Sequence, residues 1–249
     1  MNTLTLSCII FALVLGGIFL GVLLRRTLPE HHLSKDSQDV IRLGVGLIAT
    51  IGALVLGLLI AAAKSSFDTQ SGQVRQITAD IILLDNLLAQ YGPEALPIRK
   101  EMRATIGPFV DRLWGEKKAS EAAPFHANTS GEKVYLDIQA LSPRDEVQRS
   151  LQARAIQLTT DLVQTRLLLF VETGNSIPAP FLAILVFWLI IIFASFSLFA
   201  TMNTTVFIYL SLFALSASCA IFLILELDEP FTGLMMISST PLRAALGPL

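Results

Sequence analysis

Charged residues are scarce in this chain. Asp, Glu, Lys and Arg make up 15% of its 249 residues, against roughly 25% in an average soluble domain. The deficit lies in four stretches without any charge, at residues 4–24, 43–63, 181–200 and 206–225. Each has about the ~20 residues that a helix needs to cross the hydrocarbon core of a bilayer. The sequence therefore predicts four transmembrane helices and excludes a soluble globular protein.

Motifs that carry chemistry are also missing. The chain has no G-x-S-x-G, no phosphate-binding glycine loop, no H-E-x-x-H and no pair of cysteines at metal-ligand spacing. Cys8 and Cys219 both lie inside apolar stretches, where a cysteine acts as a small hydrophobic residue. A net charge of -2 gives no electrostatic footprint for nucleic acid. We expect no enzyme, no cofactor, no bound metal and no nucleic-acid partner.

The order of the stretches predicts the domain organisation of an all-α, polytopic membrane protein. Residues 1–63 and 178–227 are expected to form two transmembrane hairpins, and residues 64–177 a helical extramembrane domain between the second and third spans. Residues 228–249 follow as a C-terminal tail. Four spans place both termini and the extramembrane domain on one side of the membrane, a bacterial inner membrane in our interpretation.

Two apolar stripes at steps of three and four residues predict amphipathic helices in the extramembrane domain. They consist of Val74, Ile77, Ile81, Leu84 and Leu88, and of Val147, Leu151, Ala155, Leu158 and Leu162. The simplest way to bury both stripes is against each other in an antiparallel stalk, although part of either could face a neighbouring subunit.

Glycine, proline and capping residues predict the remaining helix boundaries. Gly92 is a typical stop for the first stalk helix, and a second helix is expected over residues 93–114. Gly107-Pro108 would split or kink that helix. Residues 115–141 read as a surface excursion with one short element. Ser142 at the N-cap and Pro143 at the first helical position predict the start of the returning stalk helix.

The orientation in the membrane stays open. Positive charges in the first short connection favour a cytoplasmic location for that connection: Arg25, Arg26, Lys35 and Arg42. Other basic residues near membrane ends point the opposite way: Lys64, Arg75, Arg166 and Arg243.

The second apolar stretch is the richest in small residues. Ala49, Ala53, Gly57 and Ala61 form a small-xxx-small ladder, and the first stretch adds Gly17-xxx-Gly21. Such faces let helix backbones approach closely in lipid, so packing within the subunit is one interpretation. The other is that this helix surrounds a symmetric pore, because a narrow pore can be lined by small residues. The pore-lining candidates are Gly46, Thr50, Ala53, Gly57, Ala61 and Lys64.

Ionisable residues are absent from the interior of all four stretches. This argues against a proton-driven pump but not against a channel. Near the membrane ends, the candidates for gating or pH sensing are His31, His32, Glu226, Asp228 and Glu229. A metal site at Glu30-His31-His32 is disfavoured because adjacent histidines do not share a helix face.

Four segments carry a family resemblance: L-P-E-H-H-L-S-K-D-S-Q-D-V (28–40), G-L-I-A-T-I-G-A-L-V-L-G-L-L-I-A-A-A-K-S-S-F-D (46–68), I-F-L-I-L-E-L-D-E-P-F-T-G (221–233) and S-S-T-P-L-R (238–243). They resemble a bacterial family of bestrophin-like membrane proteins, which has been described as a domain of unknown function. The similarity to true bestrophins, pentameric ion channels whose second helix forms the pore, implies a homo-oligomer and a cytoplasmic helical domain. The tail lacks the acidic run of calcium-sensing bestrophins, so no calcium clasp is expected.

Two functions of different classes follow. The first is a homo-oligomeric ion channel or pore, with the second transmembrane helix lining the conduit for a small inorganic ion. The alternative is a non-conducting, membrane-anchored scaffold or sensor that binds a partner through its helical domain.

Overall fold

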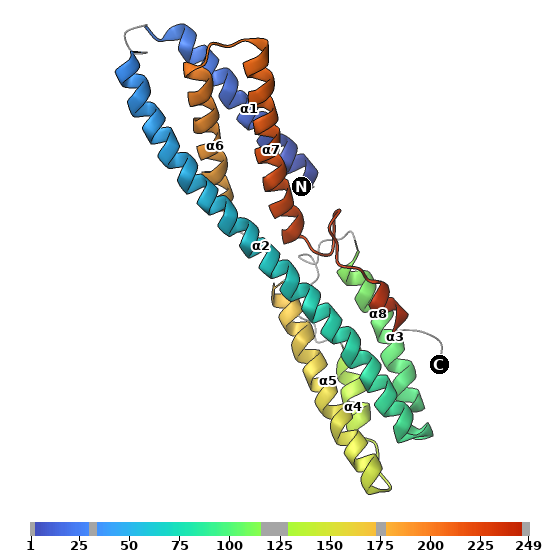
Figure 1. The fold of residues 1–249 in the computed structure, drawn as a ribbon. Helices are drawn as coiled ribbons and strands as arrows, with labels where there is room; N and C mark the ends of the chain where they lie inside the picture. The colour runs from blue at the N-terminus through green and yellow to red at the C-terminus, as the bar shows by residue number, and fades with distance from the viewer. Residues whose placement is uncertain (1–2, 30–33, 116–128, 173–177, 246–249) are drawn as a thin grey trace. The chain divides into compact units, whose positions relative to one another are not determined.

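A computed structural model describes residues 3–29, 34–115, 129–172 and 178–245. Within these ranges the chain is helical, without strands. The elements are α1 (Thr3–Thr27), α2 (Lys35–Tyr91), the short 3-10 helix η2 (Pro93–Ala95), α3 (Leu96–Leu113), α4 (Thr129–Gln139), α5 (Glu146–Glu172), α6 (Ala179–Phe199), α7 (Thr204–Asp228) and α8 (Thr240–Ala244) (Figure 1).

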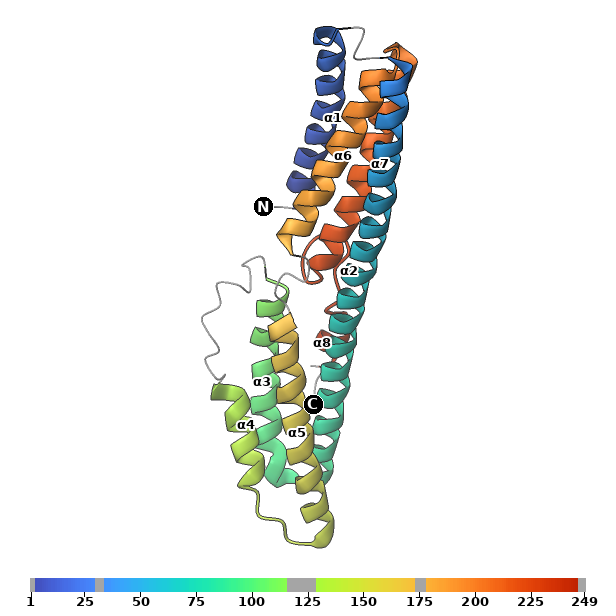
Figure 2. The ribbon, with the colours of Figure 1, turned by 90° about the vertical axis from the view of Figure 1, so that its left-hand side faces the viewer.

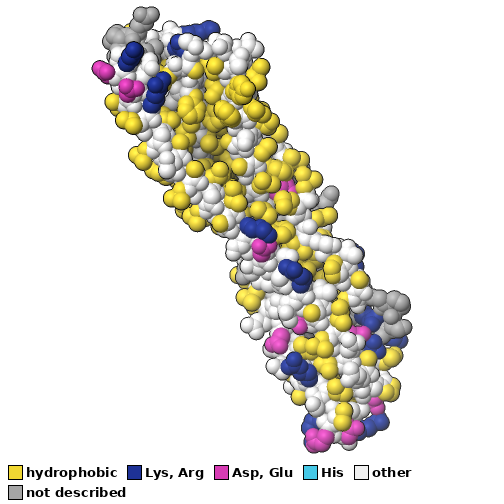
Figure 3. Space-filling model, in the orientation of Figure 1, with side chains coloured by type: hydrophobic (Ala, Val, Ile, Leu, Met, Phe, Trp, Pro, Cys, Tyr) yellow, Lys and Arg dark blue, Asp and Glu magenta, His cyan; other side chains and the backbone are white. Residues whose placement is uncertain are grey.

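The contacts divide the chain into two compact units. One contains residues 1–66 and 176–229, which we call the membrane unit; the other contains residues 67–175 and 230–249, which we call the helical domain. Among the described residues, four helices are long and apolar enough to cross a membrane: α1, α2, α6 and α7. On the face that Figure 3 shows, hydrophobic side chains cover much of the membrane unit, with charged side chains at its far end, and Lys, Arg, Asp and Glu are spread over the helical domain. The prediction of four apolar helices is confirmed.

Glycines of α1 hold the membrane unit together. A Cβ added to Gly17 would lie 2.9 Å from the carbonyl oxygen of Ile190, and one on Gly21 would clash with the backbone of Ala194. Since Gly17 meets Ile190 and Gly21 meets Ala194, α1 and α6 run in the same direction with their backbones in close contact (Figure 2). The Gly17-xxx-Gly21 motif therefore serves packing within the subunit.

Further contacts hold α1 against α6 and α7. Arg25 Nη1 near its C-terminus donates a hydrogen bond to the carbonyl oxygen of Ala200, the C-cap of α6. A cation at this position complements the partial negative charge of two helix C-termini. On its other side α1 packs on α7, where the rings of Phe19 and Phe207 lie 6.0 Å apart.

The helical domain buries the stripe of α2 in a core of several helices. Each of its five residues is at most 4% exposed: Val74, Ile77, Ile81, Leu84 and Leu88. The expectation of a two-helix stalk is too simple, because α3 and α4 contribute further buried residues to the same core: Ile98, Met102, Ile106, Val110, Val134 and Ile138. The expected stripe on α5 is also shorter than its spacing indicated, since Val147 is 67% exposed.

Two expected boundaries differ from the observed ones. Helix α3 is not split at Gly107-Pro108, and Pro108 lies inside it. A proline in a helix interior costs about 3 kcal/mol, which burial of Ile106 and Val110 on either side offsets. Helix α5 begins at Glu146 rather than after Ser142.

The later start of α5 has a simple chemical cause. The Asp145 carboxylate accepts a hydrogen bond of 2.7 Å from the backbone N–H of Gln148, and the Gln148 side chain accepts one of 2.8 Å from the N–H of Arg144. The first of these bonds satisfies a donor that the first turn of a helix leaves without a partner, and the second holds the chain just before the helix. Asp145 thereby takes the capping role that the sequence pattern gave to Ser142.

Candidate functional site

The membrane half of α2 buries only one face in the membrane unit. Val45 is 8% exposed, Leu59 6% and Ala63 fully buried. Gly52 lies on the same face, where an added Cβ would come within 3.8 Å of Trp188 of α6. Since these residues recur at roughly helical steps, the buried face is a single stripe and most of the helix circumference stays uncovered.

All six pore-lining candidates lie outside that buried stripe. Gly46, Thr50, Ala53, Gly57, Ala61 and Lys64 are all exposed in the protomer. An added Cβ on Gly46 or Gly57 would meet nothing within 4 Å. The Thr50 hydroxyl donates a hydrogen bond of 2.9 Å to the carbonyl oxygen of Gly46, one turn back in α2. Ala49 of the ladder is half-buried, but Ala53, Gly57 and Ala61 are exposed in this chain, in contrast to the buried Gly17 and Gly21 of α1.

Bulky side chains border the small-residue face of α2, since Leu54 lies one turn from both Thr50 and Gly57. Four leucines of α2 are between 63% and 77% exposed: Leu43, Leu47, Leu54 and Leu58. Bulky aliphatic side chains suit contact with lipid tails, whereas a face of glycine, alanine and threonine offers lipid little surface. The uncovered surface of the membrane half of α2 thus changes around the helix from small residues to leucines.

The acidic candidates at the end of α7 have different environments. Glu226 is 1% exposed, and its carboxylate accepts a 2.5 Å hydrogen bond from the hydroxyl of Thr3, the first residue of α1. A carboxylate near a helix N-terminus is favoured by the helix dipole. Asp228 is half-buried, and Glu229 is exposed as the C-cap of α7. Glu226 therefore joins two transmembrane helices, while the histidine candidates His31 and His32 lie outside the described residues.

Two aspartates on α2 face other helices of the helical domain. Asp85 receives hydrogen bonds from Arg99 Nε and Nη2 and from Arg103 Nη2, each 2.9 Å long. The hydrogen bond from Arg99 lowers the pKa of Asp85 below its ordinary value, with a smaller contribution from Arg103 and against the effect of burial. This pair of arginines on one carboxylate ties α3 to α2.

Asp80 has the opposite electrostatic environment. Its side chain is buried, and its Oδ1 accepts a 2.8 Å hydrogen bond from Gln76. Burial raises the pKa of Asp80, the Gln76 hydrogen bond opposes this, the Asp161 carboxylate raises it further, and Arg154 lowers it. Its other oxygen, Oδ2, has no hydrogen-bond partner among the described residues. Sequence reasoning missed this residue, although an aspartate directly beside an apolar stripe is the signal that indicates it.

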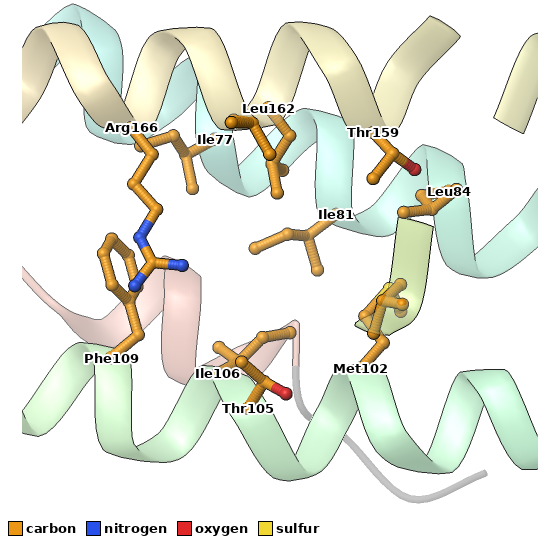
Figure 4. A pocket seen from close by; sticks show the side chains of 12 residues that line it. Ile77, Ile81, Leu84, Met102, Thr105, Ile106, Phe109, Thr159, Leu162 and Arg166 are labelled. Atoms are coloured by element: carbon orange, nitrogen blue, oxygen red, sulfur yellow. The ribbon is translucent and has the colours of Figure 1, made fainter. Parts of the chain in front are cut away.

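A small apolar pocket lies among α2, α3, α4 and α5 in the helical domain. It encloses about 60 Å³ and is lined by side chains that include Ile81, Ile106 and Leu162. At one end the guanidinium of Arg166 stacks 4.4 Å from the centre of the Phe109 ring (Figure 4). The lining is almost entirely apolar and offers few polar groups to orient a ligand. Its lining assembles no nucleophile with a general base.

No group of three or more His, Cys, Asp or Glu side chains that could hold a metal ion occurs in the described part of the chain. The candidate site therefore consists of the uncovered surface of α2 and the contact of Glu226 on α7 with Thr3 on α1. Together with four apolar helices they define a multi-pass membrane protein in contact with lipid.

Comparison with known proteins identifies the family. The Bestrophin-like domain matches residues 11–242, which span both transmembrane hairpins and the helical domain. The chain belongs to the Bestrophin-like family. Comparison with curated proteins and with solved structures gave no match.

Proposed function

We propose that this protein is a homo-oligomeric ion channel of a bacterial inner membrane, in which the small-residue face of α2 lines the conduit. The observation that carries the proposal is that this face is exposed from Gly46 to Lys64. The small-xxx-small motif of α1, in contrast, is packed inside the chain. Copies of α2 around a common axis would shield this face from lipid. Membership of the Bestrophin-like family supports the arrangement, and analogy with bestrophins favours a pentamer.

The chemistry of the face suits a narrow conduit without a binding site for one particular ion. Between residues 43 and 63 it offers aliphatic carbon, the backbone and the Thr50 hydroxyl, and no charge. A hydrophobic constriction of this kind conducts ions while it is filled with water, and it closes when the water leaves it. Lys64, directly after the apolar stretch, would place a ring of positive charge at one mouth. We propose no catalytic role.

Planar-bilayer recording of purified protein tests the proposal. We expect discrete conductance steps that are absent from protein-free bilayers. Gly57→Leu should reduce or abolish them, because it adds a bulky side chain to the proposed lumen. Gly44→Leu is the matched control: both glycines are exposed on α2 and have nothing within 4 Å of an added Cβ, but Gly44 lies two residues from Gly46 and so on a different face. Absence of conductance across pH and voltage would contradict the proposal.

A non-conducting scaffold is the second candidate, and one observation favours it. In the helical domain α2 also has exposed apolar residues: Ala79, Ile82 and Leu83. A partner protein could pack on them. Crosslinking in native membranes separates the two functions, because a ladder of like subunits supports the channel and a single heterologous adduct supports the scaffold.

A further inference from the structure

The chain forms a closed loop directly after α7. The backbone N–H of Ile237 donates a 2.8 Å hydrogen bond to the carbonyl oxygen of Pro230 and so closes residues 230–237. Gly233 has a φ of 89°, in the left-handed region that favours glycine. Phe231 is 6% exposed and Ile237 8% exposed. The two ends of the loop are therefore buried in the helical domain.

Helix α3 clamps the base of this loop. Trp114 follows α3, and its Nε1 donates a 2.7 Å hydrogen bond to the carbonyl oxygen of Ile237. The Trp114 ring also meets the Phe231 ring edge-on at 5.3 Å between centres. Beyond the loop, Arg243 forms a 2.9 Å ion pair with Asp111 of α3. These contacts fix the base of the loop.

The tip of the loop consists of three consecutive exposed hydrophobic residues. Leu234 is 75% exposed, Met235 43% and Met236 60%. No charged residue occurs from Pro230 to Leu242. Single exposed hydrophobic residues are common, but a contiguous group marks a surface that contacts a protein or a membrane.

Chain connectivity limits the distance between this tip and the end of α7. Leu234 follows Asp228, the last residue of the apolar helix α7, by six residues, which reach about 20 Å when fully extended. The polar interface adds roughly 5–8 Å to each side of the hydrocarbon core. The tip is therefore within reach of the interface that α7 crosses.

We propose that Leu234, Met235 and Met236 insert into the interfacial region of the bilayer on the side where α7 ends. The flexible, polarisable side chain of methionine adapts to a fluid surface. A second protein is a poorer occupant, because three side chains bury roughly a few hundred Å² at most, below the ~800 Å² per partner of a stable interface. The insertion couples α3 to the membrane through Trp114, and it does not depend on whether the protein conducts ions.

Fluorescence quenching in reconstituted vesicles tests the proposal. Both native cysteines are exposed in the protomer, so the background carries Cys8→Ala and Cys219→Ala. Leu234→Cys and, independently, Met236→Cys are labelled with an environment-sensitive fluorophore. Leu136→Cys on α4, an apolar residue that is 53% exposed, is the matched control.

We expect brominated acyl chains to quench both loop labels several-fold more than the Leu136→Cys label, and aqueous iodide to show the reverse order. Iodide quenching of the loop labels as strong as that of the control would overturn the proposal and place the tip in water. Protection from both quenchers would also overturn it, because the tip would then be covered by protein, such as a second copy of this chain.

Discussion

Gly21 of α1 lies so close to Ala194 of α6 that a Cβ on Gly21 would clash with the Ala194 carbonyl oxygen and with Ser197 Oγ. Gly57 of α2 also belongs to a small-xxx-small ladder, but an added Cβ there would meet nothing within 4 Å. The same motif therefore has two uses in one protein. On α1 it packs against α6, and on α2 we propose that it lines the conduit.

Substitution at Gly21 should destabilise the membrane unit. Overpacking of a tight helix contact typically costs about 1–3 kcal/mol, so Gly21→Ala should lower the melting temperature in detergent. Gly16→Ala is the control, since Gly16 is exposed on the same helix and an added Cβ meets nothing within 4 Å. We expect that variant to be unchanged or slightly more stable. Equal stability of the two variants would be inconsistent with the α1–α6 contact.

The two aspartates of α2 should give opposite pH dependences. The lowered pKa of Asp85 means that its ionised form stabilises the fold above its ordinary pKa of 3.8, and that this contribution is lost as pH falls through the lowered pKa. Asp85→Asn should therefore reduce the free energy of unfolding at neutral pH by about 2–3 kcal/mol, because charged hydrogen bonds are lost. The deficit should shrink in strong acid.

Asp80 should give the opposite dependence of stability on pH. Its raised pKa means that its contribution is fully present below 3.8 and is lost as pH rises through the raised value. Asp80→Asn should be at least as stable as the parent at neutral pH, and the difference should shrink toward pH 3.8. Chemical denaturation followed across this pH range measures both variants. A loss of stability at neutral pH for Asp80→Asn would contradict the burial argument.

Glu226 should respond to loss of its hydrogen-bonding capacity. Glu226→Ala removes the buried acceptor of the half-buried Thr3 hydroxyl, and loss of a hydrogen bond to a charged group costs about 1.5–3 kcal/mol. Glu226→Gln keeps an acceptor oxygen and should restore most of the lost stability. Thermal unfolding in detergent compares the two. If Glu226→Ala alters conductance while its melting temperature equals that of the parent, the residue acts in gating rather than in holding α1 on α7.

Lys64 should influence ion selectivity. If the small-residue face of α2 lines the conduit, Lys64→Glu replaces a ring of positive charge by a negative one, and the reversal potential in a salt gradient should move toward the cation equilibrium potential. Lys64→Gln should lie between the two. An unchanged reversal potential in Lys64→Glu would place this side chain away from the ion path.

Local patterns predicted much of the fold. Four uncharged stretches predicted the spans, and the spacing from Val74 to Leu88 predicted the buried stripe of α2, because both depend on short-range periodicity. The contribution of α3 to the core was missed because the two stripes of α2 and α5 were expected to bury each other. The burial of Phe231 and Ile237 was missed because the tail has no period.

The candidate site was predictable only in part. The sequence indicated Thr50 and Gly57 as members of a small-residue face, but it could not tell whether that face packs inside the subunit. That depends on which helix lies opposite, and Gly21 and Gly57 look alike in sequence. Likewise, the contact between Glu226 and Thr3 joins residues 223 positions apart, beyond the reach of any local pattern.

Thiol accessibility during current recording tests the role of α2 most directly. Thr50→Cys on the small-residue face and Leu58→Cys, at one of the leucines that border it, are both exposed in the protomer. They are compared in the background that carries Cys8→Ala and Cys219→Ala. A charged, water-soluble thiol reagent should change the current through Thr50→Cys channels and leave Leu58→Cys channels unaffected. Modification of Leu58→Cys alone, or no effect of the reagent on Thr50→Cys, would contradict a conduit lined by the small-residue face of α2.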